Sequence, residues 1–256
     1  MKIKIDLNGV EYNADLSQPL DISIPLSPDG PRAWYVDPMT IEPVRTDRFT
    51  GSVAEGGDVN FRNIFFNPHG HGTHTESVGH IDREVTSVNA ILSQYFFSAL
   101  LVSIEPESYP GGDSPFREKG DRIITKNQIE KALHETDCEA FVIRTTPNLD
   151  YKKSMEYSGA NPAYLEPEAL SFLRKKGIKH LLLDLPSVDR EVDGGKLQSH
   201  HEFWQSGQED DRGCTITEMI FVPDEIQDGH YLLNLQTAPF ENDATPSRPV
   251  LFSLTR

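Results

Sequence analysis

An apolar run that directly follows an amphipathic helix pattern restricts the fold more than any other feature of this sequence. The helix pattern starts at Pro167, keeps its apolar residues on one face and stops before Gly177. Residues 178–185 are then almost entirely apolar, which is typical of a strand covered on both faces. A second short apolar strand is expected at 139–145. Strand, helix and strand at this spacing predict a βαβ unit, and therefore an α/β fold whose sheet is partly parallel.

Both ends of the chain have strand patterns. Residues 1–16 alternate polar and apolar side chains around Asn8-Gly9, which predicts an N-terminal β-hairpin. Thr125 and Gln128 have the spacing of a helix capping box. Further strands are expected at 33–36, 59–66, 98–105, 230–236 and 249–254. We therefore expect one domain over residues 1–256, with a mixed sheet, a βαβ unit and β-rich termini.

Charge and cysteine content exclude several classes of protein. The chain has 24 Lys and Arg against 40 Asp and Glu, a formal charge of −16. A compact body this acidic repels phosphate, so neither nucleic acid nor an anionic membrane is an expected partner. Cys138 and Cys214 are too few for a disulfide framework, and the N-terminal residues lack the apolar stretch of a secretory signal. These features predict a cytoplasmic protein whose partner is a small molecule.

Four of the nine histidines, His69, His71, His74 and His80, fall within twelve residues. In an extended segment His74 and Glu76 share a face, and His80 is in phase with them. Imidazole and carboxylate together are the ligand set of an open Zn²⁺, Mn²⁺ or Fe²⁺ site. A polar surface loop that is merely rich in histidine is the alternative, but the regular spacing favours a metal site.

A second group of candidate residues lies far along the chain. His200 and His201 are adjacent on a predicted helix, so they cannot both point at one site. Glu218 alternates with apolar neighbours and would face inward on a strand, where a carboxylate is costly unless it is paired or metal-bound. Cys214 is either a soft ligand or, more simply, a small buried hydrophobe.

Two further sets of residues have both a functional and a structural interpretation. Asp184 and Asp189 follow the predicted strand at 178–185, and as common turn formers they are expected only to shape the loop. An aromatic wall for a flat substrate could be formed by four side chains that could equally be plain core. These are Phe65, Phe66, Phe203 and Trp204.

Several of these segments resemble one known family. GTHTESVGH at 72–80 is similar to the HxGTHxDxPxH signature of the cyclase family, which includes bacterial-type kynurenine formamidase and isatin hydrolase. LLLDLPSVD at 181–189, HHEFW at 200–204 and TEMI at 217–220 resemble later segments of that family in the same order. DGHYLLNLQ at 228–236 and PSRPVLFSL at 246–254 are similar to its terminal strands. The resemblance covers residues 20 to 256.

The resemblance implies a swivelling β/β/α fold and a metal-dependent hydrolase, usually a homodimer or homotetramer, that opens amides or cyclic amides. It implies a divalent metal, Zn or Mn, held by His74, Glu76, His80, His200 and Glu218, with His80 and Glu218 also serving catalysis. An aromatic amide is the implied substrate.

The chain departs from the family signature at its first ligand. Gly70 stands where the family has a histidine, and His69 and His71 flank it. A glycine-driven kink could turn either ring inward, so both remain candidate ligands. The longer Glu76 replaces the family's Asp. Two functions follow: a hydrolase that uses metal-activated water, or a non-catalytic small-molecule-binding protein whose metal site is degraded.

Overall fold

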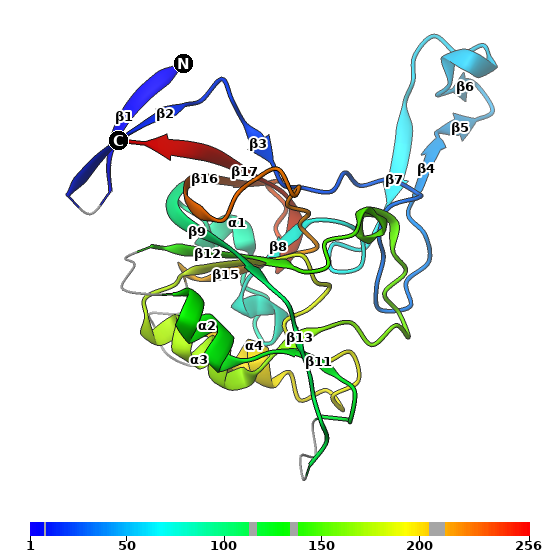
Figure 1. Ribbon diagram of the computed structural model, residues 1–256. Helices are drawn as coiled ribbons and strands as arrows, with labels where there is room; N and C mark the ends of the chain where they lie inside the picture. The colour runs from blue at the N-terminus through cyan, green and yellow to red at the C-terminus, as the bar shows by residue number, and fades with distance from the viewer. Residues whose placement is uncertain (8, 113–116, 134–137, 205–212) are drawn as a thin grey trace.

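The main sheet closes on itself into a barrel of seven strands. The computed structural model describes residues 1–7, 9–112, 117–133, 138–204 and 213–256. Around the barrel the strands are β17 (Ala244–Thr255), β16 (Gly229–Thr237), β9 (Phe96–Ile104), β12 (Ala140–Thr145), β14 (His180–Leu183), β15 (Thr215–Glu218) and β8 (His74–Glu76). Pairing of β8 with β17 completes the circle (Figure 1).

The predicted βαβ unit is confirmed within this barrel. Strands β12 and β14 pair in parallel, with Ala140 opposite His180, and helix α3 (Pro167–Lys175) connects them. Gly177 adopts φ 85° just after this helix, a left-handed conformation that glycine reaches without strain. The capping box of Thr125 and Gln128 is formed and starts helix α2 (Lys126–Ala132). The expected α/β fold with a mixed sheet is therefore the observed one.

Two apolar cores lie on opposite faces of the barrel wall. Alternate residues of β9 serve each face: Leu100 and Val102 point outward, while Leu101 and Phe97 point inward. The outer core is covered by α2, α3 and α4 (Gln198–Trp204), which lie together on one side of the sheet (Figure 1). This double cover explains why the strand region at 178–185 is almost continuously apolar.

The N-terminal hairpin extends the sheet beyond the barrel. Strand β1 (Lys2–Leu7) pairs with β2 (Val10–Asp15), and β2 pairs with the end of β17. The hairpin prediction is confirmed, although Asn8 of the turn lies outside the described residues. Strand β3 (Leu20–Asp21) adds to β17, and a single turn, α1 (Val88–Ile91), packs against the inner core.

Two-stranded ribbons form an arm that projects from the body of the protein (Figure 1). Strand β4 (Thr40–Pro43) pairs with β7 (Arg62–Phe65), and β5 (Arg45–Thr46) pairs with β6 (Phe49–Thr50). A short 3₁₀ turn, η1 (Val53–Glu55), lies at the outer end of the arm. The strand expected at 59–66 is thus present over a shorter range.

The remaining short elements complete the fold. A small sheet joins β10 (Glu107–Ser108), β11 (Arg122–Ile124) and β13 (Tyr164–Leu165). Two further 3₁₀ turns are η2 (Val78–His80) and η3 (Asp150–Ser154).

The strand predicted at 33–36 is wrong. Trp34 and Tyr35 adopt φ of 63° and 56°, left-handed values that make a tight turn, and only Arg32 forms isolated bridges. Ala33 is buried against Tyr157 and Met219, which does not require an extended chain.

A buried ion pair connects the ends of two barrel strands. Lys152 Nζ lies 2.8 Å from Asp184 Oδ2 and donates to the hydroxyl and carbonyl oxygens of Thr145. Asp184 Oδ2 also accepts from the Thr145 N–H. Because these groups are buried, each charge depends on the other for compensation. The interpretation of Asp184 as a structural residue agrees with these contacts.

We expect Lys152→Met to lower the free energy of unfolding by about 3–5 kcal/mol, because it leaves the Asp184 carboxylate buried without its cation. Chemical denaturation at neutral pH measures this loss. Lys152→Met/Asp184→Leu should recover part of it, and Lys4→Met, which breaks the exposed pair with Glu11, should cost less than about 1 kcal/mol. A Lys152→Met variant as stable as the Lys4→Met control would contradict this account.

Candidate metal centre

The histidine-rich segment forms one wall of a polar cluster on the outer face of the barrel. His74 and Glu76 share a face of β8, as predicted, while Thr75 points the other way and contacts the Thr217 hydroxyl at 2.8 Å. The pairing of β15 with β8 sets Glu218 opposite His74. The pairing of β17 with β8 sets Ala244 opposite Glu76, which brings the β16–β17 connection beside the cluster.

Glu76 is the hub of this cluster. Its side chain is 1% exposed, and three imidazoles from separate parts of the chain surround it. Oε1 lies 3.1 Å from His200 Nε2, and Oε2 lies 3.0 Å from His69 Nδ1 and 3.9 Å from His80 Nε2. Helix α4 therefore supplies one ring and the chain around β8 supplies the other two.

The outer nitrogens of three rings are held by fixed acceptors. His200 Nδ1 donates to Asp189 Oδ2 at 2.6 Å, and His69 Nε2 donates to Asp243 Oδ2 at 2.9 Å. His74 Nδ1 donates to the Gly72 carbonyl at 3.1 Å. This is how ligating histidines are usually oriented, with the outer N–H fixed and the inner nitrogen turned to the ion.

Two buried atoms at the centre of the cluster make no well-aligned hydrogen bond with any described residue, although each lies within 3.4 Å of a side chain of the cluster. They are His74 Nε2 and Glu76 Oε2. His74 carries its proton on Nδ1, so Nε2 presents a lone pair, and buried lone pairs without partners are rare in folded proteins. Ligand atoms of His69, His74 and Glu76 lie within 4.8 Å of one another, and so do those of Glu76, His80 and His200. Nitrogen and carboxylate donors in these groups fit a divalent cation such as Zn²⁺ or Mn²⁺.

The two buried carboxylates of the cluster have pKa values shifted in opposite directions. Burial would raise the pKa of Glu76, but His80, His200 and His69 hold it well below its usual range. Burial and the neighbouring Glu76 charge raise the pKa of Glu218. Glu218 Oε2 lies 3.4 Å from His74 Nε2, and its Oε1 accepts from the Val188 N–H. The lowered pKa of Glu76 keeps this carboxylate an anion, whereas the raised pKa of Glu218 makes that group able to hold a proton.

The cluster is open to solvent on the side of His69, His80 and Asp243. The side chains of His69, His80 and Asp243 are 19%, 29% and 17% exposed, whereas those of His74 and His200 are at most 3% exposed. The rings of His69 and His80 stack at 4.2 Å between centroids on the open side. A small molecule can therefore approach the cluster past these two rings.

The structure distinguishes the three positions near the missing signature histidine. A Cβ added at Gly70 would lie 2.7 Å from Val36 Cγ2, so this position has no room for a ring. His71 accepts from the Asn67 N–H and donates to the Asp37 carbonyl, which occupies both nitrogens away from the cluster. A turn at 67–70 instead carries the ring of His69 to Glu76.

Two acidic residues at the cluster were not predicted to take part in it. Asp189 was expected only to shape its loop, but it also accepts from His200, so that interpretation is incomplete. Asp243 was missed because it sits in a polar loop far along the sequence from the histidines. The one sequence feature that could have indicated Asp243 is its position just before β17. The pairing of β17 with β8, which brings Asp243 to the cluster, could not be inferred from one sequence.

The other candidate residues lie away from the cluster. Phe203 and Trp204 are fully buried in the outer core, although the Trp204 ring is 5.5 Å from that of His200. Phe65 is exposed on the arm, whereas Phe66 stacks against Phe240 at 6.1 Å. Cys214 is a buried core residue, and His201 lines a separate cavity.

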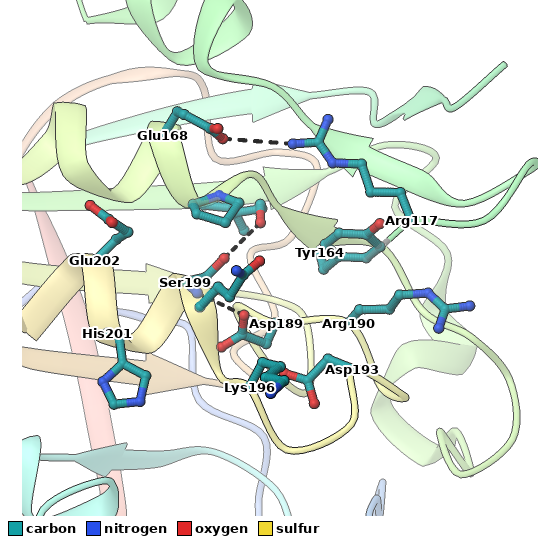
Figure 2. Close-up of a pocket in the computed structure, with 13 residues that line it drawn as sticks. Arg117, Tyr164, Glu168, Asp189, Arg190, Asp193, Lys196, Ser199, His201 and Glu202 are labelled. Carbon is teal, nitrogen blue, oxygen red and sulfur yellow. Dashed lines mark hydrogen bonds and ion pairs between the residues drawn. The ribbon is translucent and has the colours of Figure 1, made fainter. Parts of the chain in front are cut away.

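This separate cavity has a volume of about 480 Å³, and Asp189 is among the residues that line it (Figure 2). Asp189 forms part of its wall and accepts from the Ser199 N–H. Its arginines are compensated: Arg117 pairs with Glu166 and Glu168, and Arg190 pairs with Asp121. The cavity borders Asp189 but contains none of the residues that surround Glu76.

Comparison with known proteins agrees with the geometry. Residues 14–190 match the model of the Cyclase family, described as "Putative cyclase". A kynurenine formamidase from Bacillus thuringiensis (strain Al Hakam) is 28% identical over 239 residues, 93% of this chain and 95% of its own length. Isatin hydrolase A from Labrenzia aggregata superposes with a TM-score of 0.65 at 15% identity, over 92% and 93% of the two chains.

A second solved structure shares the fold. It is described as a predicted metal-dependent hydrolase from Bacillus stearothermophilus, and it superposes with a TM-score of 0.62 at 17% identity over 92% of this chain and 98% of its own. Within the described ranges, every helix is too short or too polar to cross a bilayer.

We expect cation binding to release about one proton per ion at pH 7.5. Both nitrogens of His69 face carboxylates, and although burial opposes it, the bonds to Asp243 and Glu76 raise the pKa of His69 to about 10. A cation must displace this proton, so the apparent affinity for Mn²⁺ should rise about tenfold per pH unit between about pH 6 and 8.

Calorimetric titration in buffers of different ionisation enthalpy measures the released protons. His201→Ala is the matched control, because this neighbouring ring lies outside the cluster, and it should leave the proton count unchanged. An affinity that stops rising above pH 6.5, the pKa of an ordinary histidine, would contradict the prediction.

Proposed function

Since this chain belongs to the cyclase family, we propose that it is a metal-dependent hydrolase that cleaves a carbon–nitrogen bond of an aromatic amide. The observation that carries the proposal is the pair of buried atoms His74 Nε2 and Glu76 Oε2, which make no well-aligned hydrogen bond with the described residues and lie within a ring of oriented imidazoles. The relatives named kynurenine formamidase and isatin hydrolase support an amide or cyclic amide as the bond that is cleaved.

His69, His74 and Glu76 would hold the cation, Zn²⁺ or Mn²⁺, with His200 and Glu218 completing its surroundings. A divalent ion held there supplies a Lewis acid that activates water and polarises the amide carbonyl. The outer acceptors Asp189 and Asp243 keep the rings turned inward. These contacts favour the hydrolase over a binding protein with a degraded site, because His69 provides the imidazole that is absent at Gly70.

His80 is suited to move the proton in this reaction. It is the most exposed ring of the cluster, and its Nε2 is 3.9 Å from Glu76, too far for a hydrogen bond that would fix it. In the proposed reaction His80 removes a proton from the attacking water and then delivers it to the leaving nitrogen. Water thus supplies a hydroxyl group to the carbonyl carbon and a proton to the amine, and the carbon–nitrogen bond breaks.

Glu218 is the second group suited to hold a proton. Its raised pKa, caused by burial and the Glu76 charge, favours a neutral carboxyl next to His74. We assign it a supporting role in proton transfer from within the cluster, while His80 acts from the solvent side.

An aromatic substrate is supported by residues near the open side. Phe66 and Phe240 each lie three residues before a cluster residue, His69 and Asp243 respectively, and their rings stack at 6.1 Å. Phe240 is 43% exposed, so part of this pair is available to a flat ligand.

We place the reaction in the cytoplasm. Cys138 and Cys214 are both buried without forming a disulfide, as expected in a reducing compartment. The charge of −16 supports a small-molecule substrate rather than nucleic acid or an anionic membrane.

We also propose that the chain is a homodimer or homotetramer whose copies meet through the arm at 40–66. Six large apolar side chains are exposed there: Phe49, Val53, Val59, Phe61, Ile64 and Phe65. Two-stranded ribbons are only marginally stable alone, so such an arm needs a partner surface. The arm carries only −1 of the chain's −16, and Arg48 and Arg62 form no ion pair with the described residues, so an acidic second copy can approach it.

We expect the metal-loaded protein to hydrolyse N-formylkynurenine or isatin and to lose this activity on treatment with a chelator. His74→Ala and Glu76→Gln should lose both the bound metal and the activity. His80→Ala should keep the metal and lose about 10²–10⁴-fold in kcat, because only the proton carrier is removed. Metal analysis together with absorbance assays measures both quantities.

His201→Ala is the control for these variants and should retain wild-type kcat and metal content. Retention of wild-type metal content by His74→Ala would contradict the assigned ligands. Stable metal binding without turnover of either substrate class would instead favour the non-catalytic binding protein.

Light scattering should give a mass of two or four times 28.8 kDa. Ile64→Ser/Phe65→Ser should shift this mass to that of a single chain, because it removes two of the exposed apolar side chains of β7. Val192→Ser, at a position that is 66% exposed outside the arm, should leave the assembly intact. A wild-type mass of one chain, or an arm variant that still assembles, would refute this interface.

A further inference from the structure

One carboxylate outside the resembling motifs contacts both rings on the open side of the cluster. Asp243 Oδ2 lies 2.9 Å from His69 Nε2 and 3.5 Å from His80 Nδ1. Both rings turn their other nitrogens toward Glu76, and their planes are inclined by only 31°. Asp243 is therefore the common outer contact of a stacked pair of imidazoles.

Asp243 is itself fixed by the backbone of the barrel. Its carbonyl accepts from the Ser77 N–H at 2.9 Å, and the next residue, Ala244, pairs with Glu76 in the β8–β17 ladder. On its other side, the Asn242 carbonyl accepts from the Val88 N–H. Because the backbone is held on both sides, the carboxylate has a defined position relative to Glu76.

The position of His69 explains why this chain needs such a group. Val36 fills the space at Gly70, so the imidazole comes from the neighbouring residue and reaches Glu76 from the solvent side. Its side chain is 19% exposed, compared with 0% for His74. A ring in that position requires a polar contact to stay turned inward.

On the basis of the proposed function, we propose that Asp243 is a positioning residue that fixes His69 as a metal ligand and His80 as the proton carrier. By accepting the Nε2–H of His69, it leaves Nδ1 as the nitrogen from which a cation displaces the proton. By contacting His80 Nδ1, it keeps Nε2 of that ring directed at the reaction site. One carboxylate thus couples metal binding to proton transfer.

The test compares Asp243→Asn with Glu241→Gln, a matched control in the same loop whose carboxylate accepts a hydrogen bond from the Asn89 side chain. Mn²⁺ affinity is measured by competition with a chelating dye, and kinetics are then measured at saturating Mn²⁺. Asp243→Asn should weaken Mn²⁺ binding by about 10- to 100-fold, the usual effect of removing a partner of a ligating histidine. Glu241→Gln should bind Mn²⁺ as the wild type does.

At saturating Mn²⁺, Asp243→Asn should lower kcat by between about tenfold and 10²-fold, because His80 is no longer aligned, and should leave KM nearly unchanged. Asp243→Glu should restore part of the affinity. In the His69→Ala background Asp243→Asn should cause no further loss of Mn²⁺ affinity, because the ring that it orients is gone.

Equal effects of Asp243→Asn and Glu241→Gln on Mn²⁺ affinity and kcat would overturn the inference. Loss of one whole equivalent of Mn²⁺, with the remaining affinity unchanged, would make Asp243 a ligand and also overturn it. Failure of the proposed function would be distinct, because the wild-type protein itself would then bind no Mn²⁺ or hydrolyse no amide.

Discussion

The structure of the site depends on a buried carboxylate, that of Glu76. An isolated anion at this depth would be strongly destabilising, so the fold must supply positive charge within contact distance. It does so with three imidazoles from different parts of the chain, two of which touch Glu76 at 3.0 and 3.1 Å. Those rings are in turn held by Asp189 and Asp243. The site therefore consists of a central anion, surrounding imidazoles and outer acceptors. A divalent cation would bind in this arrangement by displacing protons from the imidazoles.

The barrel brings these groups together through strand register. Pairing of β8 with β15 sets Glu218 against His74, and pairing of β8 with β17 brings Asp243 next to Glu76. Helix α4 packs on the outer face of the parallel strands. This packing places His200 beside Glu76. Packing therefore serves the site by positioning polar groups, while the buried Lys152–Asp184 pair stabilises neighbouring strand ends.

Much of this could be predicted from local patterns. The βαβ unit, the shared face of His74 and Glu76, and the burial of Glu218 follow from periodicity, because each depends on residues close in sequence. The resemblance to the cyclase family added His200 to the predicted metal ligands. Asp243 could not be inferred, because its role depends on a strand pairing across more than 160 residues of sequence. The choice between His69 and His71 depended on Val36, whose contact with Gly70 arises only from a turn at Trp34 and Tyr35 that was predicted to be a strand.

Anomalous scattering from a crystal of the metal-loaded protein, recorded at the absorption edge of the ion, tests this account most directly. We expect a peak in contact with His69 Nδ1, His74 Nε2 and the Glu76 carboxylate, with Asp243 still bonded to the far side of the His69 ring. A peak bound by His71, or a loaded crystal without anomalous density beside Glu76, would contradict it.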